Sequence, residues 1–220
     1  MRILNLYACL GGNRYKWGDE HEITAVELDP ELARLYKERF TNDTVIIADA
    51  HQYLLDHYKE FDFIWSSPPC PSHSRIRFNQ AKGRKDDVYK AVYPEMTLYQ
   101  EIIFLDNYFN GKFVVENVIP YYEPLIEAEK RGRHLYWCNF KLPQILSNRK
   151  VQVGSGNEEV KKLCEFHEID LSTYKGGQRK DKIARNLVDY EAGLTILNCV
   201  LNIEPKKVIG SLFDETYLTL

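Results

Sequence analysis

Three kinds of chemically active side chain lie near the ends of apolar runs in this 220-residue sequence. Cys70 follows a run that stops at two prolines, and Glu116 lies near the end of the run at 112–118. Arg131 and Arg133 follow shortly afterwards. A thiolate adds to an electron-poor carbon, a carboxylic acid protonates the product, and a guanidinium group stabilises negative charge. Together the three types favour covalent attack on a ring carbon.

Each of these residues also has a structural explanation when taken alone. A free cysteine such as Cys70 is often a small buried hydrophobe. Glu116 could be a surface charge at a strand end, and Arg131 and Arg133 could be a solvated pair. The combination, rather than any one residue, supports the catalytic interpretation.

A second group of residues lies at the ends of the first three apolar runs. The first run leads into residues 8–13, where Gly11 and Gly12 would let a ligand approach the backbone, although glycine pairs also occur in ordinary turns. Glu27 ends the second run, where it could accept hydrogen bonds from two ribose hydroxyls or be a solvated acid before a helix. Asp49 ends the third run, where it could face an adenine amino group or cap the next segment. Three such strand ends favour a nucleoside cofactor.

Alternating strands and helices must position these residues. Apolar runs rich in β-branched and aromatic residues predict strands at 3–7, 23–28, 45–48, 61–66, 113–118 and 134–140. Helical patterns separate several of them, which predicts βαβ units in a mostly parallel sheet. Asp29 and Pro30 predict the cap and first residue of a helix that continues to Phe40. Residues 141–184 are loop-like and locally basic, and helical spacing resumes at 187–201.

Composition narrows the class of protein. A hydrophobic content of 44% in 220 residues suffices for one well-buried core and a small appendage. The net charge of −3 means that local patches, not a global field, would hold a polyanion. The five cysteines include no Cys-x-x-Cys pair, so we expect neither a disulfide framework nor a metal site. We also expect no membrane span and no secretory leader, which favours a cytoplasmic protein.

The order and content of the motifs resemble the cytosine C5 DNA methyltransferases. Residues 7–12 look like the Phe-Ala-Gly-x-Gly-Gly cofactor turn, residues 27–29 like the ribose-binding acid and Asp49 like the adenine contact. Pro69-Cys70 resembles the nucleophile motif, with Ser74 at its trailing serine, and residues 116–118 resemble the Glu-Asn-Val motif. Residues 131–133 are similar to the Arg-x-Arg motif, and residues 185–194 to a late Asn-x-Val segment. The resemblance covers about 1–140 and 179–200.

The resemblance implies an α/β, Rossmann-like S-adenosylmethionine-dependent methyltransferase sheet with a small irregular target-recognition insertion. The catalytic domain would comprise 1–146 and 185–220, and the reduced target-recognition segment 147–184. The methyl acceptor would be C5 of a cytosine flipped out of double-stranded DNA and held by a covalent bond to Cys70. The implied catalytic residues are Cys70, Glu116, Arg131 and Arg133. The implied cofactor-binding residues are Tyr7, Ala8, Leu10, Gly11, Gly12, Glu27, Leu28, Asp49, Ala50, Pro68, Asn186 and Val188.

The candidate binding partners come from the resemblance and from one basic stretch. A restriction endonuclease is a candidate partner by resemblance, and the sequence does not indicate an oligomeric state. The basic stretch at 75–90 is a candidate phosphate-binding loop, but it also contains Asp86 and Asp87 and could be merely solvated.

The sequence departs from the family pattern at four positions. Cys9 replaces the first glycine of the turn, Asn13 replaces an aromatic residue, Pro71 replaces a glutamine, and Pro68 adds a proline before the nucleophile. Three alternatives therefore stay open. Residues 67–70 are one residue from the Ser-Pro-Pro-aromatic motif of exocyclic amino methyltransferases, the chain could be an inactive DNA-binding homologue, and the flipped cytosine could belong to RNA.

Overall fold

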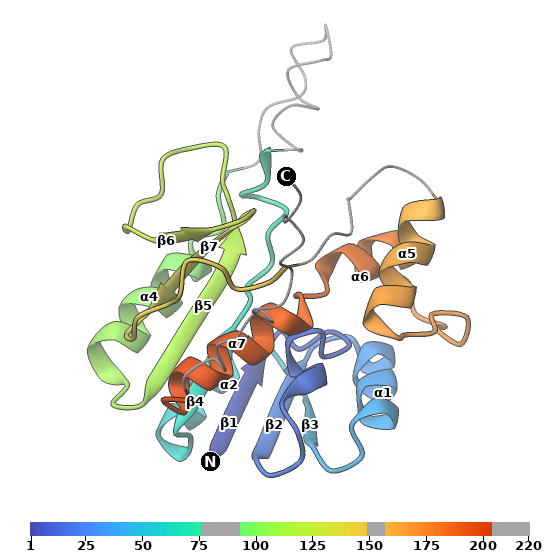
Figure 1. Cartoon of the computed structure of the whole chain (residues 1–220), viewed down its shortest axis with the longest axis horizontal. Coiled ribbons are helices and arrows are strands. Elements are labelled where there is room, and N and C mark those ends of the chain that lie inside the picture. The colour runs from blue at the N-terminus through green and yellow to red at the C-terminus, as the bar shows by residue number, and fades with distance from the viewer. Residues whose placement is uncertain (76–92, 149–156, 204–220) are drawn as a thin grey trace, which may run out of the picture.

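The computed structural model describes residues 1–75, 93–148 and 157–203. Within these residues, seven strands form one sheet in the order β3-β2-β1-β4-β5-β7-β6 (Figure 1). The strands β1 to β5 are parallel, and β7 runs antiparallel to both β5 and β6. Their bounds are β1 (Arg2–Leu6), β2 (Glu22–Glu27), β3 (Thr44–Ile47), β4 (Phe63–Ser66), β5 (Lys112–Val118), β6 (Glu129–Arg131) and β7 (His134–Cys138).

The strand order reverses between β1 and β4. From β1 the chain winds outward through β2 to β3, and from β4 it winds the other way to β5. Doubly wound sheets bind their ligands outside the carboxyl ends of the strands at such a reversal. We therefore expect a ligand site at the residues that follow β1 and β4.

Helices connect the strands and cover the sheet. The described helical segments are η1 (Asn13–Lys16), α1 (Pro30–Arg39), α2 (Ala50–His57), η2 (Tyr58–Glu60), α4 (Thr97–Tyr108), α5 (Asn157–His167), α6 (Lys180–Asn186) and α7 (Tyr190–Val200). As predicted, Asp29 caps α1: its carboxylate accepts hydrogen bonds from the backbone N–H groups of Glu31 and Leu32, and Pro30 is the first helical residue.

The two faces of the sheet are buried by different helices because side chains alternate along each strand. Leu4 and Leu6 of β1 pack with α2 and α4 on one face. Ile3 of β1 and Trp65 of β4 lie on the opposite face, where α7 packs. Figure 1 shows α7 crossing the sheet and α4 lying beside β5. Both faces are thus covered, as expected for a parallel sheet.

The Rossmann-like α/β fold predicted from the sequence is confirmed. All six predicted strands are present with ends shifted by a few residues, and β6 is an addition that the sequence did not indicate. The region expected to be loop-like contains α5 and most of α6. Among the described residues, no helix has the length and apolar character needed to cross a membrane.

The α5–α6 region is anchored on α1 and its cap. The Tyr174 hydroxyl and the Gln178 side-chain amide each donate a hydrogen bond of 3.0 Å to Asp29. Leu163 and Ile183 share an apolar cluster with Leu10 of the turn after β1. The described part of the insertion therefore lies against the first βα unit.

Candidate active site

A cavity of about 610 Å³ lies at the carboxyl edge of the sheet. Its volume is typical of sites for small molecules and cofactors, which span about 300–1,000 Å³. The lining includes residues that follow β1 to β4, residues at the end of β5, and residues from α6 and the segment that leads into α7. The residues with chemical or structural roles at this site are Tyr7, Ala8, Cys9, Gly12, Asn13, Glu27, Leu28, Asp29, Asp49, Ala50, Ser67, Pro68, Cys70, Glu116, Asn117, His134, Gln178, Lys182, Asn186 and Val188.

Glu27 joins the first two strand ends. Its Oε2 accepts a hydrogen bond of 2.8 Å from the backbone N–H of Cys9, and its Oε1 accepts one of 2.9 Å from that of Asp29. Burial raises the pKa of Glu27, against the lowering effect of these two hydrogen bonds. Each carboxylate oxygen has a second lone pair. Glu27 can therefore hold the turn and accept two ligand hydroxyls at the same time.

The turn after β1 is held in an unusual backbone conformation. Cys9 has a φ of 47°, in the left-handed region that favours glycine, and Gly11 has a φ of 67°. A Cβ on Gly11 would lie 2.4 Å from a ring carbon of Phe40 and 2.8 Å from one of Tyr36. Gly11 is thus needed for the close approach of α1. Gly12 is similarly constrained, because a Cβ added there would lie 2.3 Å from the carbonyl oxygen of Val188.

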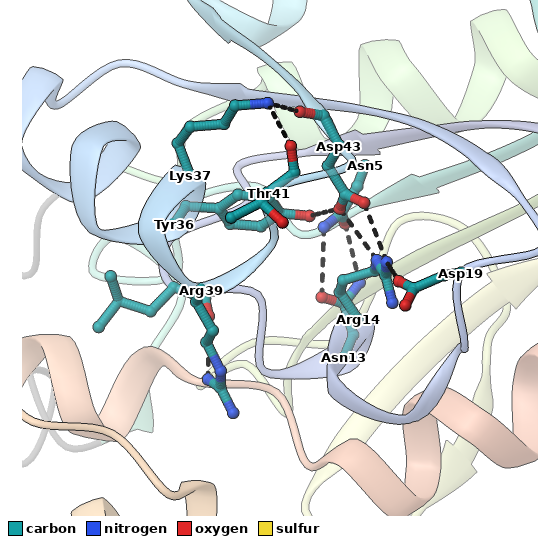
Figure 2. A network of polar contacts seen from close by, with 10 residues as sticks. Asn5, Asn13, Arg14, Asp19, Tyr36, Lys37, Arg39, Thr41 and Asp43 are labelled. Carbon is teal, nitrogen blue, oxygen red and sulfur yellow. Dashed lines mark hydrogen bonds and ion pairs between the residues drawn. The ribbon is translucent and has the colours of Figure 1, made fainter.

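A buried polar network fixes the turn after β1 in place (Figure 2). Asn13 donates from Nδ2 to Oδ1 of Asn5 at 2.8 Å, and Asn5 returns a longer hydrogen bond of 3.4 Å. The next residue, Arg14, makes two hydrogen bonds of 2.9 Å to the two carboxylate oxygens of Asp43, and Tyr36 donates to the same carboxylate. All of these side chains are buried. A fully paired network of this kind fixes geometry because any displacement leaves a buried polar group unpaired.

These residues fit an adenosine-type cofactor with a positive charge. Glu27 supplies acceptors for ribose hydroxyls, and Asp29 and Asp49 add further carboxylates to the same end of the cavity. Asp49 also caps α2 by accepting a hydrogen bond from the backbone N–H of Gln52, so both interpretations of this residue from the sequence are compatible with its position. A sulfonium cation suits such an acidic lining.

Cys70 also lines this cavity. Burial raises the pKa of the Cys70 thiol, and the charge of Glu116 raises it further, whereas Lys182 acts in the opposite direction. The segment before Cys70 is fixed by Asn117, whose side-chain amide donates a hydrogen bond of 3.0 Å to the carbonyl oxygen of Pro68. The strand end of β5 therefore holds the loop that carries the thiol.

Glu116 lines the same cavity and is buried. Its Oε2 accepts a hydrogen bond of 3.1 Å from the Ser67 hydroxyl, which in turn accepts one of 2.8 Å from the indole N–H of Trp65. Its Oε1 lies 3.4 Å from Nε2 of His134. Cys70, Glu116 and His134 thus come from three neighbouring segments into one cavity.

Four residues implied by the resemblance lie outside the described lining of the cavity. Leu10 packs in the apolar cluster with α5 and α6, and Gly11 lies against α1. The Arg131 guanidinium binds the carbonyl oxygens of Pro143 and Leu142 at 2.6 and 3.2 Å. Arg133 lies exposed in the turn before β7. Of the basic stretch at 75–90, only Arg75 belongs to the described residues, and it donates to the carbonyl oxygen of Pro120.

The sequence interpretation missed several lining residues. His134, Lys182 and Gln178 all reach the cavity, and none belongs to a motif position recognised in the sequence. The sequence predicts a strand that starts at 134, and an antiparallel strand after Glu116 begins at the edge where the preceding strand ends, but neither point selects His134 over Arg133. No comparable signal marks Lys182 or Gln178, because they lie on a helix and a loop far from the strands in sequence.

The sheet and the cavity at its carboxyl edge define a Rossmann-like α/β fold with a ligand site, and the family model that this chain matches implies a methyltransferase that uses S-adenosylmethionine. The chain belongs to the C-5 cytosine-specific DNA methylase family, whose model matches residues 1–120, more than half of the sequence. That match includes the turn after β1, Glu27, Cys70 and Glu116. A comparison with curated proteins gave no match.

Solved structures show more distant likenesses. A mutant of DNMT2 from Spodoptera frugiperda is 25% identical over 53% of this chain and 35% of that chain, with a TM-score of 0.36. A putative DNA modification methyltransferase from an E. coli prophage is 16% identical over 56% of this chain and 33% of that chain, with a TM-score of 0.37. The putative methyltransferase yhhF from Escherichia coli is 13% identical over 62% and 73% of the two chains, with a TM-score of 0.40. The family assignment therefore depends on the family model alone.

Proposed function

We propose that this protein transfers a methyl group from S-adenosylmethionine to C5 of a cytosine in double-stranded DNA through a covalent bond to Cys70. One observation carries the proposal: Cys70 and Glu116 line the same cavity as Glu27 and the turn after β1. A nucleophile and an acid thus share one cavity with a cofactor-type carboxylate. The exocyclic amino methyltransferases need no thiol at this position, so the pairing of Cys70 with Glu116 favours C5 chemistry.

The thiolate of Cys70 would add to C6 of the cytosine ring. The π electrons of the C5–C6 double bond then form a C4–C5 double bond, the C4–N3 π electrons move onto N3, and N3 takes a proton from Glu116. This makes C5 nucleophilic, and S-adenosylmethionine, when bound, supplies the methyl group that C5 accepts. Loss of the C5 proton to a base then expels the sulfur of Cys70.

The surroundings of Cys70 set a condition for this chemistry. Because burial raises the pKa of the thiol, Cys70 is protonated at neutral pH until a cation or a base acts on it. Lys182 lines the cavity and lowers the pKa of Cys70. We assign to Lys182 the stabilisation of negative charge on the thiolate, whereas the sequence indicates a guanidinium group for the stabilisation of negative charge. Those two arginines stay candidates for contacts with the base or the DNA.

Double-stranded DNA can reach such a cavity only if the target nucleotide leaves the stack, which costs a few kcal/mol. We propose that the division into a catalytic domain, 1–146 and 185–220, and a target-recognition segment, 147–184, serves this step. The anchoring of Tyr174 and Gln178 on Asp29 supports a segment that is fixed beside the cavity. With so short a segment, we expect a short or degenerate target sequence.

DNA with 5-fluorocytosine at target sites tests the proposal directly. After Cys70 has attacked C6 and C5 has been methylated, fluorine cannot leave as a cation, and elimination stops. We expect a protein–DNA complex that survives denaturing electrophoresis and forms only with S-adenosylmethionine. A pool of substituted duplexes of mixed sequence covers the unknown target site.

Two variants make the experiment specific. Cys70→Ser should give no complex, whereas Cys199→Ser, which removes a thiol on α7 away from the cavity lining, should give as much complex as the parent. An amino methyltransferase would methylate the pool without an adduct, and an inactive homologue would do neither. A complex with 5-fluorocytosine RNA but not with DNA would reassign the substrate to RNA.

A further inference from the structure

His134 lies beside the proposed acid although it belongs to no assigned motif. It begins β7, which is antiparallel to β5, and it pairs in register with Val118 at the end of that strand. The start of β7 therefore lies at the carboxyl edge where the site is built. The imidazole lines the cavity, and its Nε2 lies 3.4 Å from Oε1 of Glu116. The His134 side chain is partly exposed, whereas Glu116 is buried.

The hydrogen bonds on the other side of Glu116 indicate which oxygen can carry a proton. An indole N–H is a donor only, so the Ser67 hydroxyl must accept from Trp65 and donate its own proton to Oε2 of Glu116. Oε2 is therefore already an acceptor. A proton on the carboxyl group is best placed on Oε1, which faces Nε2 of His134. Between them, the two atoms can share one proton.

The two arginines of the Arg-x-Arg segment do not take this position. Arg131 is bound to the carbonyl oxygens of Pro143 and Leu142, and Arg133 lies exposed in the turn. Neither belongs to the described lining of the cavity. His134, the next residue along the chain, is the basic group from this hairpin that reaches Glu116.

Other titratable groups face this pair from three elements. Cys70 approaches from the loop after β4, and the charge of Glu116 helps to keep its thiol protonated. Tyr136 lies on β7, where burial keeps the pKa of its hydroxyl well above the ordinary value, so it stays neutral near pH 7. Lys182 approaches from α6.

We propose that His134 is a positioning residue for the acid, and that His134 and Glu116 together hold the single proton delivered to N3 of the cytosine. This inference rests on the function proposed above. When the sulfur of Cys70 bonds to C6, the C4–N3 π electrons move onto N3, which takes the proton from the pair. A neutral imidazole and a carboxylate remain. When the bond between C6 and sulfur breaks, N3 returns the proton to the pair.

The variants His134→Gln and Glu116→Gln, alone and combined, test the proposal. A glutamine at 134 keeps an N–H donor on a side chain of similar reach but cannot carry the extra proton. His57→Gln is the matched control, because His57 contacts a carboxylate, Glu60, at the far end of α2 and outside the cavity lining. Methyl transfer to the mixed DNA pool is measured in single turnovers across the pH range, and S-adenosylmethionine affinity by calorimetry.

We expect His134→Gln to lower the rate at neutral pH by about tenfold to a hundredfold. This is at or below the lower end of the roughly 10²–10⁴-fold contribution of general acid catalysis, because Glu116 itself remains. The pH profile of the rate should also differ from that of the parent, because the imidazole no longer shares the proton with Glu116. In the Glu116→Gln background, His134→Gln should change the rate by less than about threefold, since it acts through Glu116. Cofactor affinity and thermal stability should stay near those of the parent and of His57→Gln.

Two results would overturn the inference while leaving the proposed function intact. One is a His134→Gln enzyme with the parent's pH profile. The other is a full and independent loss of rate from His134→Gln in the Glu116→Gln background. If the parent itself forms neither 5-methylcytosine nor the 5-fluorocytosine adduct, the proposed function fails first and the inference falls with it. A general loss of folding is recognised separately by loss of cofactor binding.

Discussion

Gly193→Ala should destabilise this protein, although the same change in the interior of most helices is favourable. Alanine is preferred to glycine in a helix by about 1 kcal/mol. At Gly193 of α7, however, a Cβ would lie 2.2 Å from the carbonyl oxygen of Asn13 and 2.8 Å from its Cα. These are backbone atoms, so no side chain can rotate away. The absence of a side chain at Gly193 therefore lets α7 approach the backbone of Asn13 closely.

The size of the effect depends on the atoms that have to move. Overpacking a buried site costs about 1–3 kcal/mol, and a shift of Asn13 also strains its 2.8 Å hydrogen bond to Asn5, worth about 1 kcal/mol. After the gain in helix propensity, we expect a net loss of about 1–3 kcal/mol of unfolding free energy. At this chain length that corresponds to a fall in Tm of about 2–4 °C for each kcal/mol.

Urea denaturation followed by circular dichroism measures the unfolding free energy, and calorimetry measures S-adenosylmethionine affinity. Because Gly12 and Asn13 line the cavity, the affinity of Gly193→Ala should fall together with its stability. The control is Gly177→Ala, where a Cβ would have no atom within 4 Å and should change stability by no more than about 0.5 kcal/mol. A Gly193→Ala protein that is about 1 kcal/mol more stable than the parent would show that α7 does not press on the turn.

Three further changes test neighbouring parts of the site. Asp43→Ala leaves the buried Arg14 guanidinium without its main partner and should lower the unfolding free energy by about 3–5 kcal/mol in urea denaturation. A decrease of less than about 1 kcal/mol would contradict a paired buried network. Glu27→Ala should weaken S-adenosylmethionine binding by about tenfold to a hundredfold in calorimetry, because it removes charge-assisted hydrogen bonds worth about 1.5–3 kcal/mol. An unchanged Kd would mean that Glu27 only holds the turn through the N–H of Cys9. Because the pKa of Cys70 is raised, the rate of its alkylation by iodoacetamide should rise about tenfold per pH unit to beyond about pH 8.5, the ordinary pKa of a cysteine. A plateau of this rate near neutral pH would show a preformed thiolate.

The strands could be predicted from sequence because burial on both faces requires continuous apolar runs. Residues 63–66 are fully buried in β4, and the apolar run around them was visible without any structure. The missed strand, β6, consists of Glu129, Lys130 and Arg131 at the edge of the sheet. A three-residue charged edge strand has no apolar pattern, and its charges are what such edges use to avoid pairing with other chains. Its existence depends on the partner strand rather than on its own residues.

The site was predictable as far as strand ends determine it. Glu27, Cys70 and Glu116 end or follow parallel strands, so their convergence on one edge follows from the fold. The hairpin after β5 was not predictable in the same way. One residue decides whether Arg133 or His134 points to the acid, and that choice is set by the turn and by the register with Val118, which no local pattern shows.

The departures from the family turn show why a motif cannot be judged one position at a time. Cys9 stands where the family has glycine and keeps the positive φ that glycine favours, at a cost of about 1 kcal/mol. Its backbone N–H is held by Glu27, 18 residues away, and Asn13 is matched by Asn5 on the preceding strand. Each departure has its partner elsewhere in the chain, so the turn stays closed around the cavity. An inactive homologue would therefore have to lose the chemistry at Cys70 or Glu116 while keeping the cofactor, and S-adenosylmethionine binding without any methyl transfer is the result that would identify it.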